Sequence, residues 1–108
     1  MAFLPHKTDA AGTVSTQADL ADERVAAAIG AVPVNLALFT VPAGAGTEPD
    51  RHASHELWLV RSGSGVVSCA GERFPVGPGR LLAISGGEEH WLTAGDEPVE
   101  VLSLWWSK

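Results

Sequence analysis

From residue 32 onward, short apolar segments alternate with turns rich in glycine and proline, and this pattern constrains the fold more than any other feature. The segments are VPVNLALFTV, HELWLVRSG, GVVSCAGERFPVG, GRLLAIS, HWLTAG and VEVLSLWW. Strand-like segments that recur every ~8–12 residues between turns are typical of a β-sandwich or small barrel. GVVSCAGERFPVG is predicted to be a hairpin in itself, with its turn near Ala70-Gly71. The sequence therefore predicts an all-β domain.

The first part of the chain has a different pattern. Residues 1–15 are mixed in character and are predicted to form an arm or an edge strand around FLPH. Residues 15–30, STQADLADERVAAAIG, begin with hydroxyl side chains and early acidic residues and end in a glycine. Apolar residues at helical spacing, mostly alanine, lie between them, and this pattern favours a short helix. We expect one domain, with an N-terminal arm and short helix over 1–31 and a β-barrel over 32–108.

The charge of the chain excludes several classes of partner. There are 7 Lys and Arg against 13 Asp and Glu, which gives a net charge of −6 with no basic cluster, so neither nucleic acid nor an anionic membrane surface is an expected partner. The uncharged stretch between Arg24 and Glu48 is broken by Pro33 and Pro42 and is not predicted to span a membrane. The single cysteine, Cys69, and the lack of a secretory signal pattern favour the cytoplasm.

Polar groups suited to chemistry gather around one strand start. Asp50, His52 and Glu56 lie in DRHASHELW, where a loop turns into an apolar segment. Alternate residues of a strand share a face, so Glu56 and Trp58 are expected to point the same way, whereas His55 is expected on the opposite face, packed or at the surface. His90 follows the glycine-rich loop SGGEE, where another strand begins.

The spacing of these residues is similar to that of the two motifs of the cupin superfamily. The first motif is Gly, five residues, His-x-His, three or four residues, Glu, six residues and Gly. This chain has Gly44, five residues, Asp50-Arg51-His52, three residues, Glu56, six residues and Gly63. An aspartate thus stands where the first histidine is usual.

The second motif follows in register. It is Gly, five residues, Pro-x-Gly, two residues, His, three residues and Asn. This chain has Gly79, five residues, Ser85-Gly86-Gly87, two residues, His90, three residues and Ala94. The 15 residues between Gly63 and Gly79 resemble the short spacing of small microbial cupins. The serine and the alanine depart from the family pattern at positions that usually serve a turn and an outer hydrogen bond.

The resemblance implies a small jelly-roll-like β-barrel with a divalent metal at its mouth. Carried over residue by residue, the ligands are His52, Glu56 and His90, with Asp50 as a further candidate; iron, zinc, manganese and nickel all remain open. Two imidazoles and one carboxylate are the ligand set of mononuclear iron(II) sites with open positions. Two carboxylates cancel the charge of a divalent ion and disfavour a bound hydroxide. Trp58 is the candidate wall of a substrate pocket.

These features favour a metal-dependent enzyme that acts on a small organic metabolite, of the dioxygenase, isomerase or lyase type, with His52, Glu56 and His90 as catalytic residues. One alternative is a metal-free enzyme of the dehydratase or epimerase type, in which the same residues act as acid and base. Another is a non-catalytic module that binds a small ligand or a metal. A homodimer is expected, with the partner subunit covering the Trp105-Trp106 end of the last strand.

Overall fold

The computed structural model describes residues 6–19, 27 and 34–107. The strands of this part of the chain are β1 (His6–Thr8), β2 (Val14–Asp19), β3 (Asn35–Val41), β4 (His55–Ser62), β5 (Gly65–Cys69), β6 (Glu72–Val76), β7 (Leu81–Ile84), β8 (His90–Ala94) and β9 (Val99–Trp106). All their pairings are antiparallel. The predicted all-β fold is confirmed.

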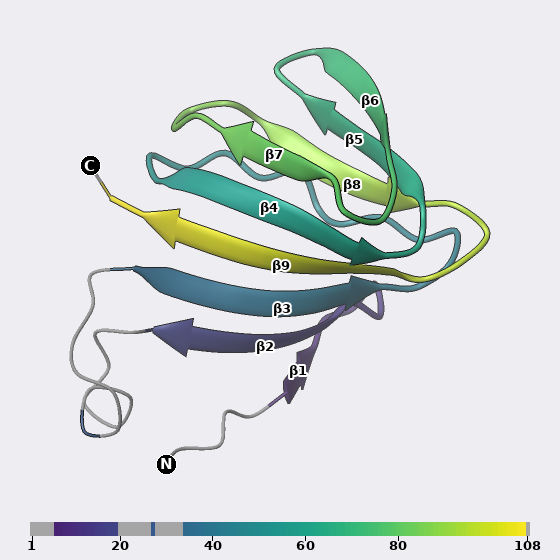
Figure 1. The fold of residues 1–108 in the computed structure, drawn as a ribbon, viewed down its shortest axis with the longest axis horizontal. Helices are drawn as coiled ribbons and strands as arrows, with labels where there is room; N and C mark the ends of the chain where they lie inside the picture. The colour runs from purple at the N-terminus through teal and green to yellow at the C-terminus, as the bar shows by residue number, and fades with distance from the viewer. Residues whose placement is uncertain (1–5, 20–26, 28–33, 108) are drawn as a thin grey trace.

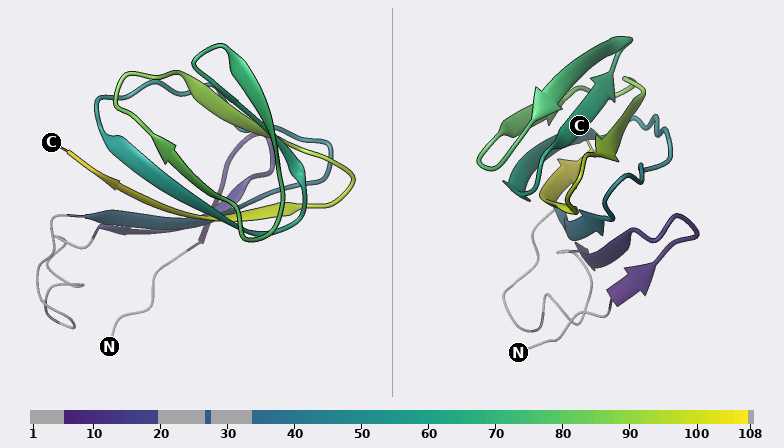
Figure 2. Two further views of the ribbon diagram at one scale, coloured as in Figure 1. Left: turned by 45° about the horizontal axis from the view of Figure 1, so that its top comes forward. Right: turned by 90° about the vertical axis from the view of Figure 1, so that its right-hand side faces the viewer.

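Two sheets face each other. The larger sheet has the order β1-β2-β3-β9-β4-β7 and the smaller has the order β6-β5-β8 (Figure 1). The larger sheet curves, and the smaller one lies over the half formed by β9, β4 and β7 (Figure 2). The last strand, β9, pairs with both β3 and β4, so the end of the chain occupies the middle of the larger sheet. The space between the sheets holds the core and, at one end, the site described below.

The predicted hairpin is confirmed, with its turn at Ala70-Gly71. Cys69 pairs with Glu72, and the two turn residues have φ of 51° and 81°. Positive φ at both central positions is the mark of the two-residue turn whose twist matches that of an antiparallel pair. Glycine tolerates this conformation at no cost, whereas alanine there is uncommon.

The core consists mainly of valines from alternate strand positions. In β9, Val99, Val101 and Ser103 are buried while the residues between them are partly exposed. In β4, Trp58 and Val60 are buried, as the expected alternation required. β-branched side chains are stiff and fit a pleated surface, which suits them to a thin space between two sheets.

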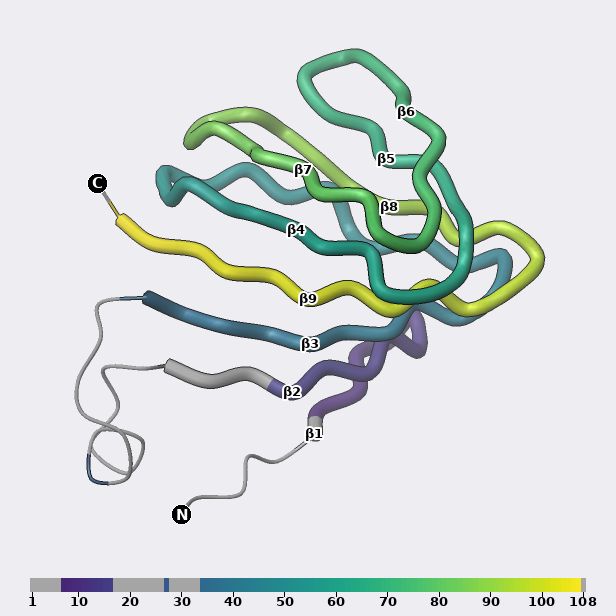
Figure 3. The backbone as a smooth tube through the Cα atoms, in the orientation of Figure 1, coloured from purple at the N-terminus to yellow at the C-terminus, as the bar shows by residue number. Residues whose placement is uncertain are grey.

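The predicted helix over 15–30 is wrong in its first part. Val14–Asp19 form strand β2, which pairs along its whole length with β3, and β1 pairs in turn with β2 (Figure 3). The edge of β3 offers backbone donors and acceptors. Pairing with them overrides the helix pattern, because a stripe made mostly of alanine buries little apolar surface. The rest of the predicted helix lies outside the described residues, except Ala27, which is helical. Strand β1, His6–Thr8, forms an edge of the larger sheet, and the first three residues of the predicted FLPH segment lie outside the described residues.

Within residues 6–19, 27 and 34–107, no helix has the length and apolar character needed to cross a membrane.

Candidate metal centre

The loop before β4 is fastened to the first residue of β8. Asp50 and His90 form an isolated antiparallel bridge, in which the N–H of each donates to the carbonyl of the other at 2.9 Å. The loop therefore carries Asp50 and His52 to the place where β8 presents His90. β4 adds Glu56 from its second position.

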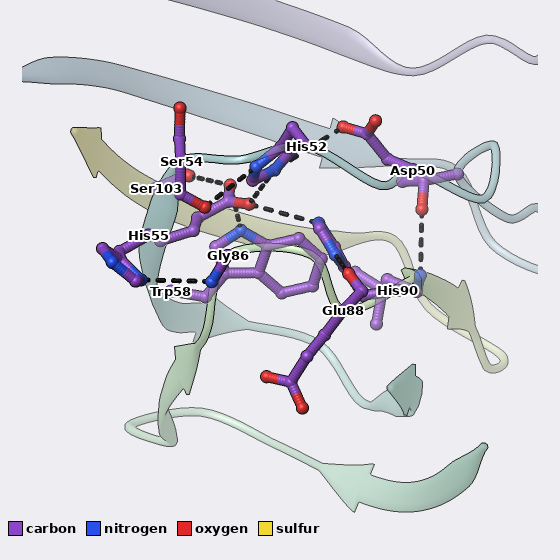
Figure 4. Close-up of polar contacts among 12 residues, drawn as sticks. Asp50, His52, Ser54, His55, Trp58, Gly86, Glu88, His90 and Ser103 are labelled. Atoms are coloured by element: carbon purple, nitrogen blue, oxygen red, sulfur yellow. Dashed lines mark hydrogen bonds and ion pairs between the residues drawn. The ribbon is translucent and has the colours of Figure 1, made fainter. Parts of the chain in front are cut away.

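Three of these residues form a cluster that could hold a metal ion. One ligand atom from each of Asp50, His52 and His90 lies within 4.8 Å of the others. Asp50 Oδ2 lies 3.8 Å from His52 Nε2, and the two imidazole rings meet edge to face with centroids 5.1 Å apart. Figure 4 shows both rings turned toward the same point. His90 is buried, His52 is half-buried and Asp50 is exposed.

Glu56 lies against both imidazoles. Its Oε1 is 3.1 Å from His52 Nε2 and 3.2 Å from His90 Nε2. Its Oε2 accepts hydrogen bonds from Trp58 Nε1 at 2.6 Å and Ser103 Oγ at 2.5 Å. The two carboxylate oxygens thus have separate sets of partners.

Each imidazole ring is oriented by a hydrogen bond from Nδ1, the ring nitrogen that points away from the cluster. His52 Nδ1 lies 3.0 Å from the carbonyl of Ser54, and His90 Nδ1 lies 2.9 Å from the carbonyl of Glu88. Because a carbonyl oxygen only accepts, each Nδ1 carries the hydrogen, and the lone pair of a neutral ring is on Nε2. Metal-binding histidines are typically oriented in this way by a carbonyl or carboxylate.

Three acceptor atoms therefore converge at one point: two imidazole nitrogens and Glu56 Oε1. Three acceptors this close together repel one another unless a proton or a metal ion lies between them. The donor set, two imidazoles and carboxylate oxygens, suits iron, zinc and manganese. The residues present fit a divalent metal.

The metal-free electrostatics show how strongly these groups interact. Burial raises the pKa of Glu56, but hydrogen bonds from His90, Ser103 and Trp58 outweigh it and bring that pKa down to about 2. Burial lowers the pKa of His90, but the hydrogen bond and the charge of Glu56 reverse this effect and raise it above its usual value. Without a metal, the contact with Glu56 therefore favours a proton on the His90 imidazole.

The cluster opens into a cavity of about 470 Å³. Its walls include the aromatic side chains of Phe39, Trp58 and Trp105. Trp58 faces the same side of β4 as Glu56, as expected; its role toward a substrate stays a prediction. His55 is absent from the lining, and its Nδ1 accepts a hydrogen bond from the N–H of Gly86 at 3.1 Å.

The loop before β8 keeps its shape without the proline of the family motif. Glu88 Oε1 accepts from the N–H of Ser85 at 2.8 Å, and the carbonyl of His52 accepts from the N–H of Gly87 at 2.7 Å. Gly87 has a φ of 89°, in the region that favours glycine. The bond to His52 fastens the second motif to the first, and the bond to Glu88 uses a backbone N–H that a proline at position 85 would lack.

Ser103 is the site residue that the sequence pattern did not reveal. It is the one hydroxyl within the apolar segment VEVLSLWW, at a position where the alternation predicts an inward side chain. A buried hydroxyl needs a partner, and this was the available signal. The identity of the partner, Glu56 on the neighbouring strand, follows only from the strand register.

Comparisons with known proteins agree with this architecture. A model of the cupin domain matches residues 37–105, and the chain belongs to the cupin family. The solved plu4264 protein of Photorhabdus luminescens superposes with a TM-score of 0.78 at 23% identity, over 98% of this chain and 82% of that one. A predicted oxalate decarboxylase of Thermotoga maritima superposes with a TM-score of 0.74 at 18% identity, over 97% and 92%. Both likenesses show the fold.

A curated relative is similar in sequence over part of the chain. The L-ectoine synthase of Bordetella avium is 32% identical over 63 residues, which are 55% of this chain and 48% of that protein. A second L-ectoine synthase, from Bordetella petrii, is 31% identical over 49 residues, or 44% and 37%. The match thus spans half or less of the length of these relatives.

Proposed function

We propose that this protein is a metal-dependent cupin enzyme that acts on a small organic metabolite. The observation that carries the proposal is the convergence of His52 Nε2, His90 Nε2 and Glu56 Oε1, with both Nδ1 atoms held by carbonyls, at the wall of a cavity. The similarity to L-ectoine synthases supports an enzymatic role. Location in the cytoplasm and assembly as a homodimer stay predictions.

The chain's own residues have separate tasks in this proposal. His52, His90, Glu56 and Asp50 would hold the metal, which supplies Lewis acidity or, as iron, oxygen chemistry. Phe39, Trp58 and Trp105 would exclude water and hold the apolar part of the substrate. Dioxygenase, isomerase and lyase reactions all fit such a site.

The charges around the cavity limit the substrate. Asp9 and Glu48 line it in addition to the candidate ligands, and its described lining contains neither lysine nor arginine. Arg61 instead pairs with Glu100 at 3.0 Å, away from the cavity. Since Asp50 and Glu56 already balance a divalent ion, a dianion such as oxalate would meet further negative charge. We therefore infer a neutral or cationic substrate.

A metal-free acid–base enzyme is the second candidate, and a specific observation favours it. The hydrogen bond to Glu56 raises the pKa of His90, which favours a proton on Nε2, 3.2 Å from Glu56 Oε1 at the cavity wall. A protonated imidazole beside a carboxylate is a general acid with its base. A dehydratase or epimerase reaction would use this pair directly.

Metal content after purification without a histidine tag or chelator tests the two candidates. The wild type is compared with His52→Ala and His90→Ala, and His55→Ala is the matched control because His55 lies outside the cavity lining. The metal proposal predicts close to one metal ion per chain in the wild type and in His55→Ala, and a strong loss in the other two. A wild type that stays empty after loading with iron, zinc, manganese or nickel contradicts it and supports the acid–base candidate.

A further inference from the structure

We propose that Ser103 and Trp58 are positioning residues that make Glu56 a one-oxygen ligand, which presents Oε1 to the metal and keeps Oε2 away from it. The inference rests on the metal site of the proposed function. It concerns which residues orient Glu56 toward that metal.

The contacts of Oε2 are the first support. It accepts from Ser103 Oγ at 2.5 Å and from Trp58 Nε1 at 2.6 Å, both short for their kind. A carboxylate oxygen has two lone pairs in its plane, so these two donors use the hydrogen-bonding capacity of Oε2. Oε1 has neither donor and faces the two imidazole nitrogens.

The rigidity of the two donors is the second support. Ser103 is 1% exposed and Trp58 is 4% exposed. They are direct cross-strand partners in the pairing of β9 with β4, so the register of the sheet sets their spacing. The Trp58 ring also meets Phe39 and His90 edge to face, with centroids 5.5 and 5.6 Å apart. Figure 4 shows Trp58 beneath the cluster and Ser103 beside it.

A two-oxygen coordination by Glu56 would break these bonds. The metal would then compete with the indole N–H and the hydroxyl for Oε2, and both donors would be left buried without an acceptor, which is costly. The lowest-energy arrangement keeps Oε2 on the protein and gives Oε1 to the metal. With Asp50, His52 and His90, this leaves positions on the metal open for a substrate.

Cobalt(II) titration followed by visible absorption tests this proposal without any activity assay. The variants are Ser103→Ala and Trp58→Phe, each of which removes one donor to Oε2. Ser103→Thr retains the hydroxyl, and Ser68→Ala is the matched control because Ser68 is also buried, at 5% exposed, on β5. Outer hydrogen bonds of this kind contribute about 10–100-fold to metal affinity.

We expect both donor-removing variants to bind cobalt about 10–100-fold more weakly. We also expect weaker visible bands, because a freed Oε2 raises the coordination number and higher-coordinate cobalt absorbs less. Ser103→Thr should restore the wild-type spectrum, and Ser68→Ala should retain it. If Ser103→Ala does not fold, Trp58→Phe gives the same test.

Two results would overturn the inference in distinguishable ways. A wild type that binds cobalt, with donor-removing variants that match it in affinity and spectrum, contradicts the positioning role alone. A wild type that binds no cobalt contradicts the proposed metal site and this inference together.

Discussion

Asp50 and His90 exchange both of their backbone hydrogen bonds, each 2.9 Å long, although one lies in a loop and the other begins β8. This bridge joins the two motifs of the site through the main chain. The Asp50 side chain is 63% exposed and has no part in the bridge. The backbone thus fixes where Asp50 lies, and its side chain can be changed without moving the loop.

We therefore expect Asp50→Ala to weaken metal binding by at least about ten-fold while leaving the thermal midpoint of the metal-free protein unchanged. Asp50→Asn keeps an oxygen donor without the charge and should lose less. Competition against a metal indicator measures both. Equal affinity in all three proteins would show that Asp50 is an ordinary loop residue and not a ligand.

Glu56→Gln should separate metal binding from stability. The new amide can accept from Trp58 and Ser103 with its oxygen and donate to both imidazole nitrogens with its NH₂ group, so the metal-free site remains fully hydrogen-bonded. We expect metal affinity to fall by more than about ten-fold and urea unfolding near pH 7.5 to show a smaller loss of stability than a variant without a hydrogen-bonding group at this position.

Glu56→Ala is the contrasting variant. It leaves the indole N–H and the hydroxyl without their acceptor, which costs about 1–3 kcal/mol for each buried donor. The same urea unfolding should show a clear loss of stability. If Glu56→Gln is as unstable as Glu56→Ala, the stabilising contribution comes from the charge of Glu56 and not from its hydrogen bonds.

The stability of the metal-free protein should depend on pH on both the acidic and the alkaline side. The pKa of Glu56 is lowered from 4.5 to about 2, so its stabilising contribution is complete above pH 4.5 and is lost as the pH falls toward 2. The pKa of His90 is raised from 6.5, so its contribution is complete below pH 6.5 and is lost as the pH rises through the higher value. Urea unfolding across pH, with chelator present, measures both effects. Glu56→Gln should reduce the pH dependence of stability on both sides. An unchanged pH profile in that variant would contradict the interaction between Glu56 and His90.

Two glycines of the motifs differ in what they tolerate. Gly63 has a φ of 77°, and a Cβ there would lie 2.0 Å from the carbonyl oxygen of Pro98. Gly79 has a φ of 86° but open space around it. We expect Gly79→Ala to cost about 1–2 kcal/mol of unfolding free energy from backbone strain alone. Gly63→Ala should cost clearly more, because the chain entering β9 must move. Equal losses in denaturant titrations would show that the chain yields freely at Pro98.

The sequence by itself predicted the strands from β3 to β9, because alternating apolar residues and glycine turns are local signals. Motif spacing also pointed to His52, Glu56 and His90 together. The prediction of secondary structure failed at Ser15–Asp19. There, pairing with the edge of β3 overrode a weak helix pattern. A short segment cannot show which edge is available to it.

The sequence thus determined the fold family and the types of residue that could bind a metal, since both depend on local pattern and chemistry. Only the tertiary structure decided how those residues are aimed. It placed Ser103 opposite Trp58 and oriented both imidazoles through hydrogen bonds from Nδ1 to backbone carbonyls. It also gave the two oxygens of Glu56 different partners. These relationships depend on strand register and on loops that meet across the barrel. Contacts between distant parts of the chain set both.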